Sequence, residues 1–203
     1  MDSEIDMKTR AIIALFLVVA WSHAASAHVG AGGVNGFVHG FSHPLNGIDH
    51  VLAMVAVGAF AAHLGGQALW LLPLTFISVL AVAGFVGMVG INLPLVEIGI
   101  GLSVVVLGLV LAFQLSLPIV AATVLVGFFA IFHGYSHGAE MPESASGLAY
   151  GGGFVCATVL LHAIGIGLGI GIERLGKQYS QTLVQVGGSA MALTGIAILA
   201  GFV

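Results

Sequence analysis

The chain has 203 residues, of which 59% are hydrophobic and only 6% are charged. Roughly a quarter of the residues in a soluble domain are charged, so this composition excludes an ordinary soluble domain and indicates an integral membrane protein. The formal net charge is −4, and the four basic side chains are Lys8, Arg10, Arg174 and Lys177, too few and too scattered for a nucleic-acid surface.

Residues 1–27 are typical of a secretory signal peptide. Lys8 and Arg10 form its positive segment, a short apolar run covers residues 11–21, and Ala25-Ser26-Ala27 is a small-residue cleavage motif. The apolar run is too short to cross a bilayer, so we expect cleavage after Ala27 rather than an additional helix.

Residues 28–42 then form a short periplasmic segment rich in glycine and histidine. Cleavage makes His28 the new N-terminus. Its free amine and imidazole are a candidate capture site for a divalent cation, and a disordered terminus is the alternative.

Residues 43–203 are predicted to form one all-α membrane domain. Apolar runs of about 20 residues, the length that crosses the hydrocarbon core of a bilayer, recur along this part of the chain. We expect six membrane-spanning helices, at residues 44–64, 69–91, 95–114, 117–137, 148–171 and 182–202.

The distribution of charge supports a topology with both mature termini on the outer side of the membrane. Leader cleavage leaves the N-terminus outside, and six crossings return the C-terminus to the same side. Arg174 and Lys177 then fall in a cytoplasmic loop, as the positive-inside rule requires.

Most ionisable side chains fall at the outer ends of the first, third and fourth predicted spans. Such groups cost on the order of several kcal/mol there unless they are paired or bind an ion. Imidazole and carboxylate together are a ligand set for divalent transition metals. The candidate metal ligands are His39, His43, Asp49, His50, Glu97, His133, His137 and Glu140.

The spacing of these histidines favours ligand pairs on one helical face. His133 and His137 are four residues apart, so both imidazoles lie on one side of a helix. His39 and His43 have the same spacing in a matching sequence, H-G-aromatic-S-H. Glu140 lies about 10 Å beyond His133 along the helix axis, so His133, His137 and Glu140 cannot easily share one ion, and Glu140 is a candidate either for the entrance or for a carboxylate that supports a ligand.

Two arrangements stay open for the adjacent residues Asp49 and His50. In one, Asp49 orients a neighbouring metal-bound imidazole. In the other, both face one site because Pro44 and Gly47 interrupt the helix. Glu97 is also ambiguous, since the helix dipole alone stabilises an acid in a first turn.

Two further histidines lie deeper in the membrane. His162 is about 20 Å from the outer end of the fifth predicted span, and His63 is about 20 Å below His50. Intramembrane histidines are functional candidates by default. We predict that both lie on a translocation path. The alternatives are a hydrogen bond to a neighbouring helix for His162 and an interfacial position for His63.

The sequence H-P-L-N-G-I-D-H, from His43 to His50, resembles the signature H-P-x-x-G-x-D-H of the HupE/UreJ family of bacterial membrane proteins. The similarity extends over the leader, the six predicted spans, Glu97 and the run from His133 to Glu140. The resemblance implies a nickel or cobalt permease, linked to hydrogenase or urease maturation or to cobalamin supply. It also implies metal binding at His43, Asp49 and His50.

We therefore expect a permease that moves Ni²⁺ or Co²⁺ inward across the lipid bilayer, with Zn²⁺ as a further candidate. The chain has no Walker A motif, so we expect no ATP hydrolysis and no prosthetic group. An intramembrane zinc-dependent hydrolase could use the same ligands. A sensor or accessory protein that binds metal without transporting it is the third option. The oligomeric state is open, and a homo-oligomer is one option.

Overall fold

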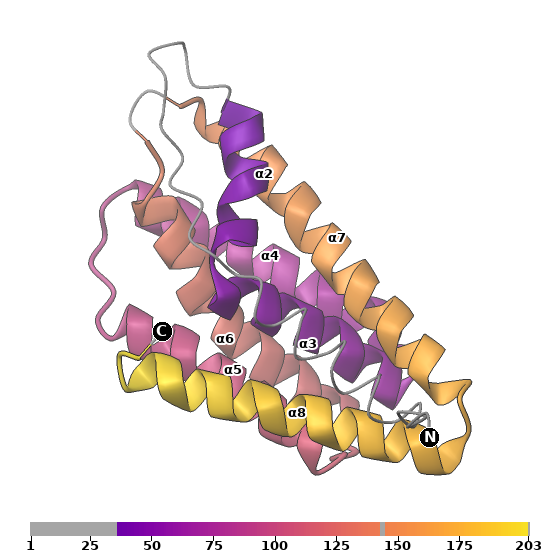
Figure 1. Ribbon diagram of the computed structural model, residues 1–203. Coiled ribbons are helices and arrows are strands. Elements are labelled where there is room, and N and C mark those ends of the chain that lie inside the picture. Colours follow the sequence, from indigo (N-terminus) through magenta and orange to yellow (C-terminus); the bar gives the residue numbers. More distant parts are fainter. Residues whose placement is uncertain (1–35, 143–144, 203) are drawn as a thin grey trace, which may run out of the picture. The chain divides into compact units, whose positions relative to one another are not determined.

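The computed structural model describes residues 36–142 and 145–202 (Figure 1). Over these residues every regular element is an α-helix and no strand is present, which confirms the all-α prediction for this part. The predicted leader and His28 lie outside the described residues. The helices are α2 (Gly36–Asn46), α3 (Ile48–Leu64), α4 (Ala68–Met88), α5 (Val96–Ala112), α6 (Ile119–Ala139), α7 (Gly147–Glu173) and α8 (Lys177–Leu199).

The described helices have the length and composition of a membrane protein. Four of them, α4, α6, α7 and α8, are long and apolar enough to cross a bilayer. The pair α2 and α3 passes the same test together, although the two helices meet at an angle of 84°. Helix α5 is apolar but has only 17 residues. Each predicted span overlaps one of these helices, while six crossings stay a prediction.

The first predicted span differs most from the structure. We expected one helix over residues 44–64, but helix α2 already begins at Gly36, runs through Pro44 and ends at Asn46. Pro44 lacks the N–H that would continue the hydrogen-bond ladder, and the helix ends two residues later. Gly47 is extended, with φ −97° and ψ 119°, and α3 begins at the next residue. An interruption at Pro44 and Gly47 was one of the two arrangements left open for Asp49 and His50, and the structure has this break between α2 and α3.

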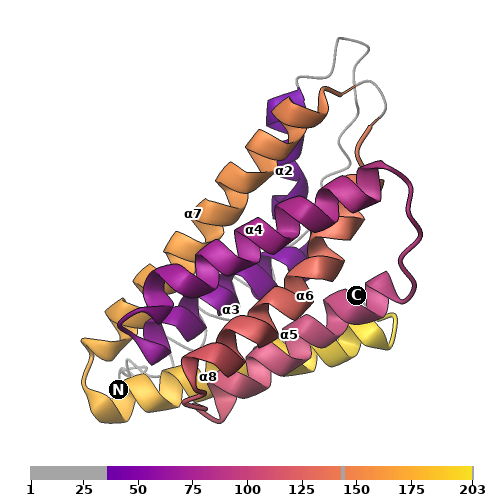
Figure 2. The same ribbon diagram turned by 180° about the vertical axis from the view of Figure 1, so that it is seen from behind.

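Helices that are far apart in sequence form the main contacts. Helix α3 packs against α7, α4 against α6, and α5 against α8, as Figures 1 and 2 show. Helix α7 has 27 residues and also contacts α2, so one helix supports both sides of the break at Gly47. Large buried side chains, Met54, Phe60, Leu72 and Phe76 among them, form the apolar core.

Glycines allow these helix backbones to approach closely. A Cβ on Gly138 of α6 would overlap the carbonyl oxygen of Gly84 on α4. A Cβ on Gly58 of α3 would overlap the carbonyl oxygen of His162 on α7. Small residues have the same role at many membrane helix interfaces, where lipid supplies no hydrophobic driving force.

The glycines of α7 provide a matched test of this packing. A Cβ on Gly165 would overlap the carbonyl oxygen of Val55, whereas a Cβ on Gly167 would meet nothing within 4 Å. We expect Gly165→Ala to destabilise the protein by about 1–3 kcal/mol, since overpacking forces the helices apart. Gly167→Ala should leave stability unchanged. Thermal unfolding in detergent compares the two, and equal midpoints would contradict this packing.

Candidate metal centre

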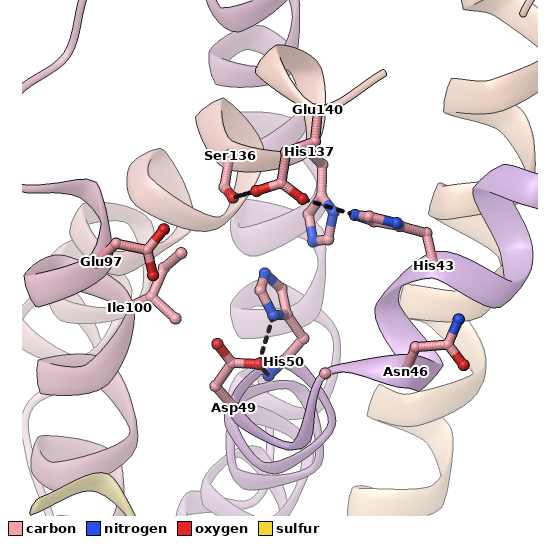
Figure 3. Close-up of a pocket in the computed structure, with 10 residues that line it drawn as sticks. His43, Asn46, Asp49, His50, Glu97, Ile100, Ser136, His137 and Glu140 are labelled. Atoms are coloured by element: carbon pink, nitrogen blue, oxygen red, sulfur yellow. Dashed lines mark hydrogen bonds and ion pairs between the residues drawn. The ribbon is translucent and has the colours of Figure 1, made fainter. Parts of the chain in front are cut away.

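A cavity of about 250 Å³ opens where α2, α3, α5 and α6 meet (Figure 3). Six of the eight candidate metal ligands line it, although they come from four different helical segments. The structure therefore brings together residues separated by almost 100 positions in the sequence. The lining residues are His43, Asn46, Gly47, Asp49, His50, Glu97, Ile100, Ser136, His137 and Glu140.

The break at Gly47 positions Asp49 and His50 at the floor of this cavity. Oδ1 of Asp49 accepts a hydrogen bond from the backbone N–H of His50 at 2.8 Å and another from Nδ1 of the same residue at 2.7 Å. A Cβ on Gly47 would lie 2.6 Å from that carboxylate oxygen, so a larger residue would disturb the pair. Because a carboxylate only accepts, Nδ1 of His50 carries the proton and Nε2 keeps a lone pair.

His133 and His137 approach this Asp–His pair from α6. The ring centroid of His50 lies 4.8 Å from that of His133 and 4.3 Å from that of His137. Both α6 histidines are buried. Nε2 of His50, Nδ1 of His133 and both ring nitrogens of His137 are buried without a hydrogen-bond partner among the described residues. Several lone pairs thus gather in one place, as a cation would require.

The arrangement is not yet a coordination sphere. Among residues 36–142 and 145–202, no group of three or more His, Cys, Asp or Glu side chains is already placed to hold a metal ion. The ring of His50 instead contacts those of His133 and His137 edge to face. Coordination of an ion therefore requires these side chains to rotate.

Glu140 links α2 and α6 at the mouth of the cavity. Its Oε2 accepts from Nε2 of His43 at 3.1 Å, and its Oε1 accepts from the hydroxyl of Ser136 at 2.6 Å. The hydrogen bond from His43 lowers the pKa of Glu140 below its usual 4.5, although partial burial opposes this effect. Glu140 is therefore a half-exposed carboxylate at neutral pH, in the entrance position that its spacing from His133 suggested.

The remaining candidates lie in three different settings. Glu97 is exposed in the first turn of α5 and lines the same cavity. His39 does not line it, since its ring lies 6.0 Å from that of His43 and 5.8 Å from that of Tyr150. The structure thus gives no support to His39 as a ligand in this cavity. His63 is half-buried in the last turn of α3.

His162 lies deeper than the cavity and is 2% exposed. Neither of its ring nitrogens has a hydrogen-bond partner in the part of the chain that the structure describes. The predicted alternative, a hydrogen bond to a neighbouring helix, is therefore not seen. The ring of Phe76 lies 5.1 Å from that of His162 and 5.8 Å from that of His133. Phe76 thus contacts both His133 of the outer histidines and His162.

Sequence reasoning missed Ser103, whose hydroxyl lies 2.8 Å from Nε2 of His133. A signal was present, because Ser103 is the only polar side chain of α5 apart from Glu97. Its contact with His133 depends on how α5 and α6 pack, which a single sequence does not reveal. Ser136 was also missed as a partner of Glu140, although the two residues are four apart, a spacing that brings side chains together on one helical face.

The fold and the cavity define a helical membrane protein with imidazole and carboxylate groups gathered at one end of its helices. Residues 15–198 match the HupE / UreJ protein family, and the chain belongs to this family. It is 44% identical to Protein HupE of Rhizobium leguminosarum bv. viciae over 195 residues, which cover 96% of this chain and all of that protein. No solved structure is similar to it. The family is associated with nickel and cobalt transport and is of the transporter type.

Proposed function

We propose that this protein is a permease that takes up Ni²⁺ or Co²⁺ from the periplasm into the cytoplasm. The observation that carries the proposal is the cavity in which His43, His50 and His137 meet from three helices. Imidazole nitrogens suit Ni²⁺, Co²⁺ and Zn²⁺, so the preference for nickel or cobalt rests on family membership. The cellular role would be metal supply for hydrogenase or urease maturation or for cobalamin.

Capture begins at the carboxylates of the cavity. Glu140 and Glu97 place negative charge at its mouth, and such charge concentrates divalent cations before they bind. The lone pairs of His50, His133 and His137 then replace part of the hydration shell of the ion. Because the rings must rotate to coordinate it, we infer a site that holds its cargo moderately and releases it again.

The inward path passes the ring of Phe76. This side chain is fully buried and contacts both His133 and His162, so it would separate an outer site from a deeper ligand. His162 offers the ring nitrogen that carries no proton to an ion that passes this ring. His63 follows near the other end of α3. Six crossings, an inner-membrane location and periplasmic termini complete the proposed arrangement.

The membrane potential is a sufficient driving force for this transport. A divalent ion that moves down an inside-negative potential gains about 4.6 kcal/mol per 100 mV, which corresponds to roughly 10³-fold accumulation. Exchange against protons would serve equally well. The test is uptake of radioactive Ni²⁺ and Co²⁺ into sealed proteoliposomes under an imposed potential. Metal binding without uptake would instead identify an accessory or sensor protein.

Replacement of Glu140 by glutamine tests the entrance. We expect the external metal concentration for half-maximal uptake to rise about 3- to 10-fold, with little change in the maximal rate, because attraction is lost but the inner ligands remain. Since the pKa of Glu140 is lowered, its contribution is present at neutral pH and disappears only as the pH falls through that lowered pKa.

Glu173→Gln is the matched control for this substitution. Glu173 ends α7, far along that helix from Tyr150, whose ring lies beside His43. We expect its replacement to leave both kinetic parameters unchanged. A Glu140→Gln variant with wild-type half-saturation at neutral pH would contradict an entrance role.

A further inference from the structure

Ser103 has a position that neither the sequence pattern nor the proposed ligand set explains. It lies in α5, is completely buried and contacts His133 of α6. Its Oγ is 2.6 Å from the carbonyl oxygen of Ile100 and 2.8 Å from Nε2 of His133. We propose that Ser103 fixes the tautomer of His133 and thereby makes Nδ1 of that ring the atom that binds the transported metal.

The hydroxyl group of Ser103 has a single proton and can donate to only one of its two neighbours. The carbonyl oxygen of Ile100 can only accept, and two oxygen atoms 2.6 Å apart repel each other unless a proton lies between them. Ser103 therefore donates to Ile100. Its Oγ can then only accept from His133, so Nε2 of that ring carries the proton. A neutral imidazole has one N–H, and Nδ1 of His133 is left with a lone pair.

The lone pair on Nδ1 of His133 indicates that this atom binds a ligand. Nδ1 of His133 is buried and lacks a hydrogen-bond partner in the described part of the chain. The ring stands perpendicular to that of His50, with centroids 4.8 Å apart. A buried acceptor without a donor is unfavourable, and a cation between the two rings would satisfy it.

Ser103 and Asp49 then have the same role toward two different imidazole rings, those of His133 and His50. Asp49 accepts from Nδ1 of His50 and leaves Nε2 free, whereas Ser103 accepts from Nε2 of His133 and leaves Nδ1 free. Both are positioning residues, since metal-bound histidines are usually held by a hydrogen bond on the other ring nitrogen. Asp49 brings a negative charge to its ring, and Ser103 brings none to the buried one.

The tautomer can be measured without metal and without transport. We would label the histidines of the full-length protein with ¹⁵N, purify it in detergent, and read protonation at each ring nitrogen by NMR. The signals of His133 are assigned by their loss in His133→Asn. We expect an Nε2–H tautomer in wild type and in Ser103→Thr, which keeps a hydroxyl, and a changed or mixed tautomer in Ser103→Ala.

Titration with Co²⁺, followed through its absorption spectrum, measures the consequence for binding, which rests on the proposed function. Ser103→Ala should weaken Co²⁺ affinity by about 10- to 100-fold, and Ser103→Thr should restore it to within about 3-fold of wild type. Thermal unfolding of the metal-free variants separates this effect from a general loss of structure.

The two proposals fail in different ways. An Nδ1–H tautomer of His133 in the wild-type protein would overturn the role of Ser103, whatever the protein transports. Wild-type affinity together with an unchanged tautomer in Ser103→Ala would overturn it as well. If wild-type protein binds neither Co²⁺ nor Ni²⁺, the permease proposal falls, while the tautomer still decides the role of Ser103.

Discussion

Replacement of His50 by alanine is expected to reduce uptake of Ni²⁺ and Co²⁺ by at least about 100-fold, because loss of a ligand should cost no less than the upper end of the losses seen when only the hydrogen-bond partner of a ligand is removed. His50 has the central place in the cluster, because its ring contacts both His133 and His137 and its Nδ1 is held by Asp49. The alanine variant loses the ligand and leaves the Asp49 carboxylate without its main partner. Initial rates of radioactive metal uptake into proteoliposomes measure the effect.

Two companion variants separate coordination from orientation. Asp49→Asn keeps the ligand but removes the charge that holds it, so we expect an intermediate loss of about 10- to 100-fold. His39→Ala removes a histidine of the same motif that does not line the cavity, and we expect less than about a 3-fold change. Equal losses in His39→Ala and His50→Ala would contradict the location of the metal site in this cavity.

Much of the candidate site could be anticipated because helix geometry and topology act together. His133 and His137 share a helical face at any i, i+4 spacing, and the alternation of membrane spans places the end of α6 beside the start of α3. The entrance position of Glu140 followed from its distance along the same helix. These inferences needed only local periodicity and the rule that consecutive spans alternate in direction.

The sequence suggested an interruption at Pro44 and Gly47, but the change of direction there could not be predicted in the same way. Pro44 and Gly47 both interrupt helices, yet the apolar run that follows looks like one span because hydropathy does not register a change in direction. The structure turns the chain by 84° there, and His39, unlike His43 of the same helix α2, does not line the cavity that His50 lines. A repeated H-G-aromatic-S-H motif therefore has two different environments, which tertiary structure alone decides.

Ser103 shows a second limit of sequence reasoning. Its hydroxyl contacts a histidine 30 residues away on another helix, and no spacing within α5 encodes that contact. A lone serine in an apolar helix is more often satisfied by its own backbone, and Ser103 does bond to Ile100 as well. Only the packing of α5 against α6 shows that one hydroxyl contacts both groups.

Replacement of His162 by leucine is expected to leave metal binding intact and to reduce uptake by roughly 10-fold or more. Phe76 contacts both His133 and His162 and separates the two along the proposed path, so we expect the affinity of the outer ligands not to depend on His162. An ion that leaves them, however, would find no nitrogen beyond the aromatic ring and would face an apolar core. Metal titration in detergent and uptake in proteoliposomes, performed on the same preparation, measure the two effects separately.

Thr158→Val is the matched control, since Thr158 lies one turn before His162 on α7 and is also fully buried. Its hydroxyl donates to the carbonyl oxygen of Phe154 in its own helix, so it is not free to bind an ion, and valine has nearly its shape. We expect this variant to bind and transport like the wild type. Wild-type uptake by His162→Leu would place the path elsewhere, whereas a parallel loss of binding and uptake would make His162 part of the outer site. Retained metal binding with lost uptake in His162→Leu is the result expected if the ion passes His162. A sensor or an accessory protein would not need a histidine that the bound metal does not touch.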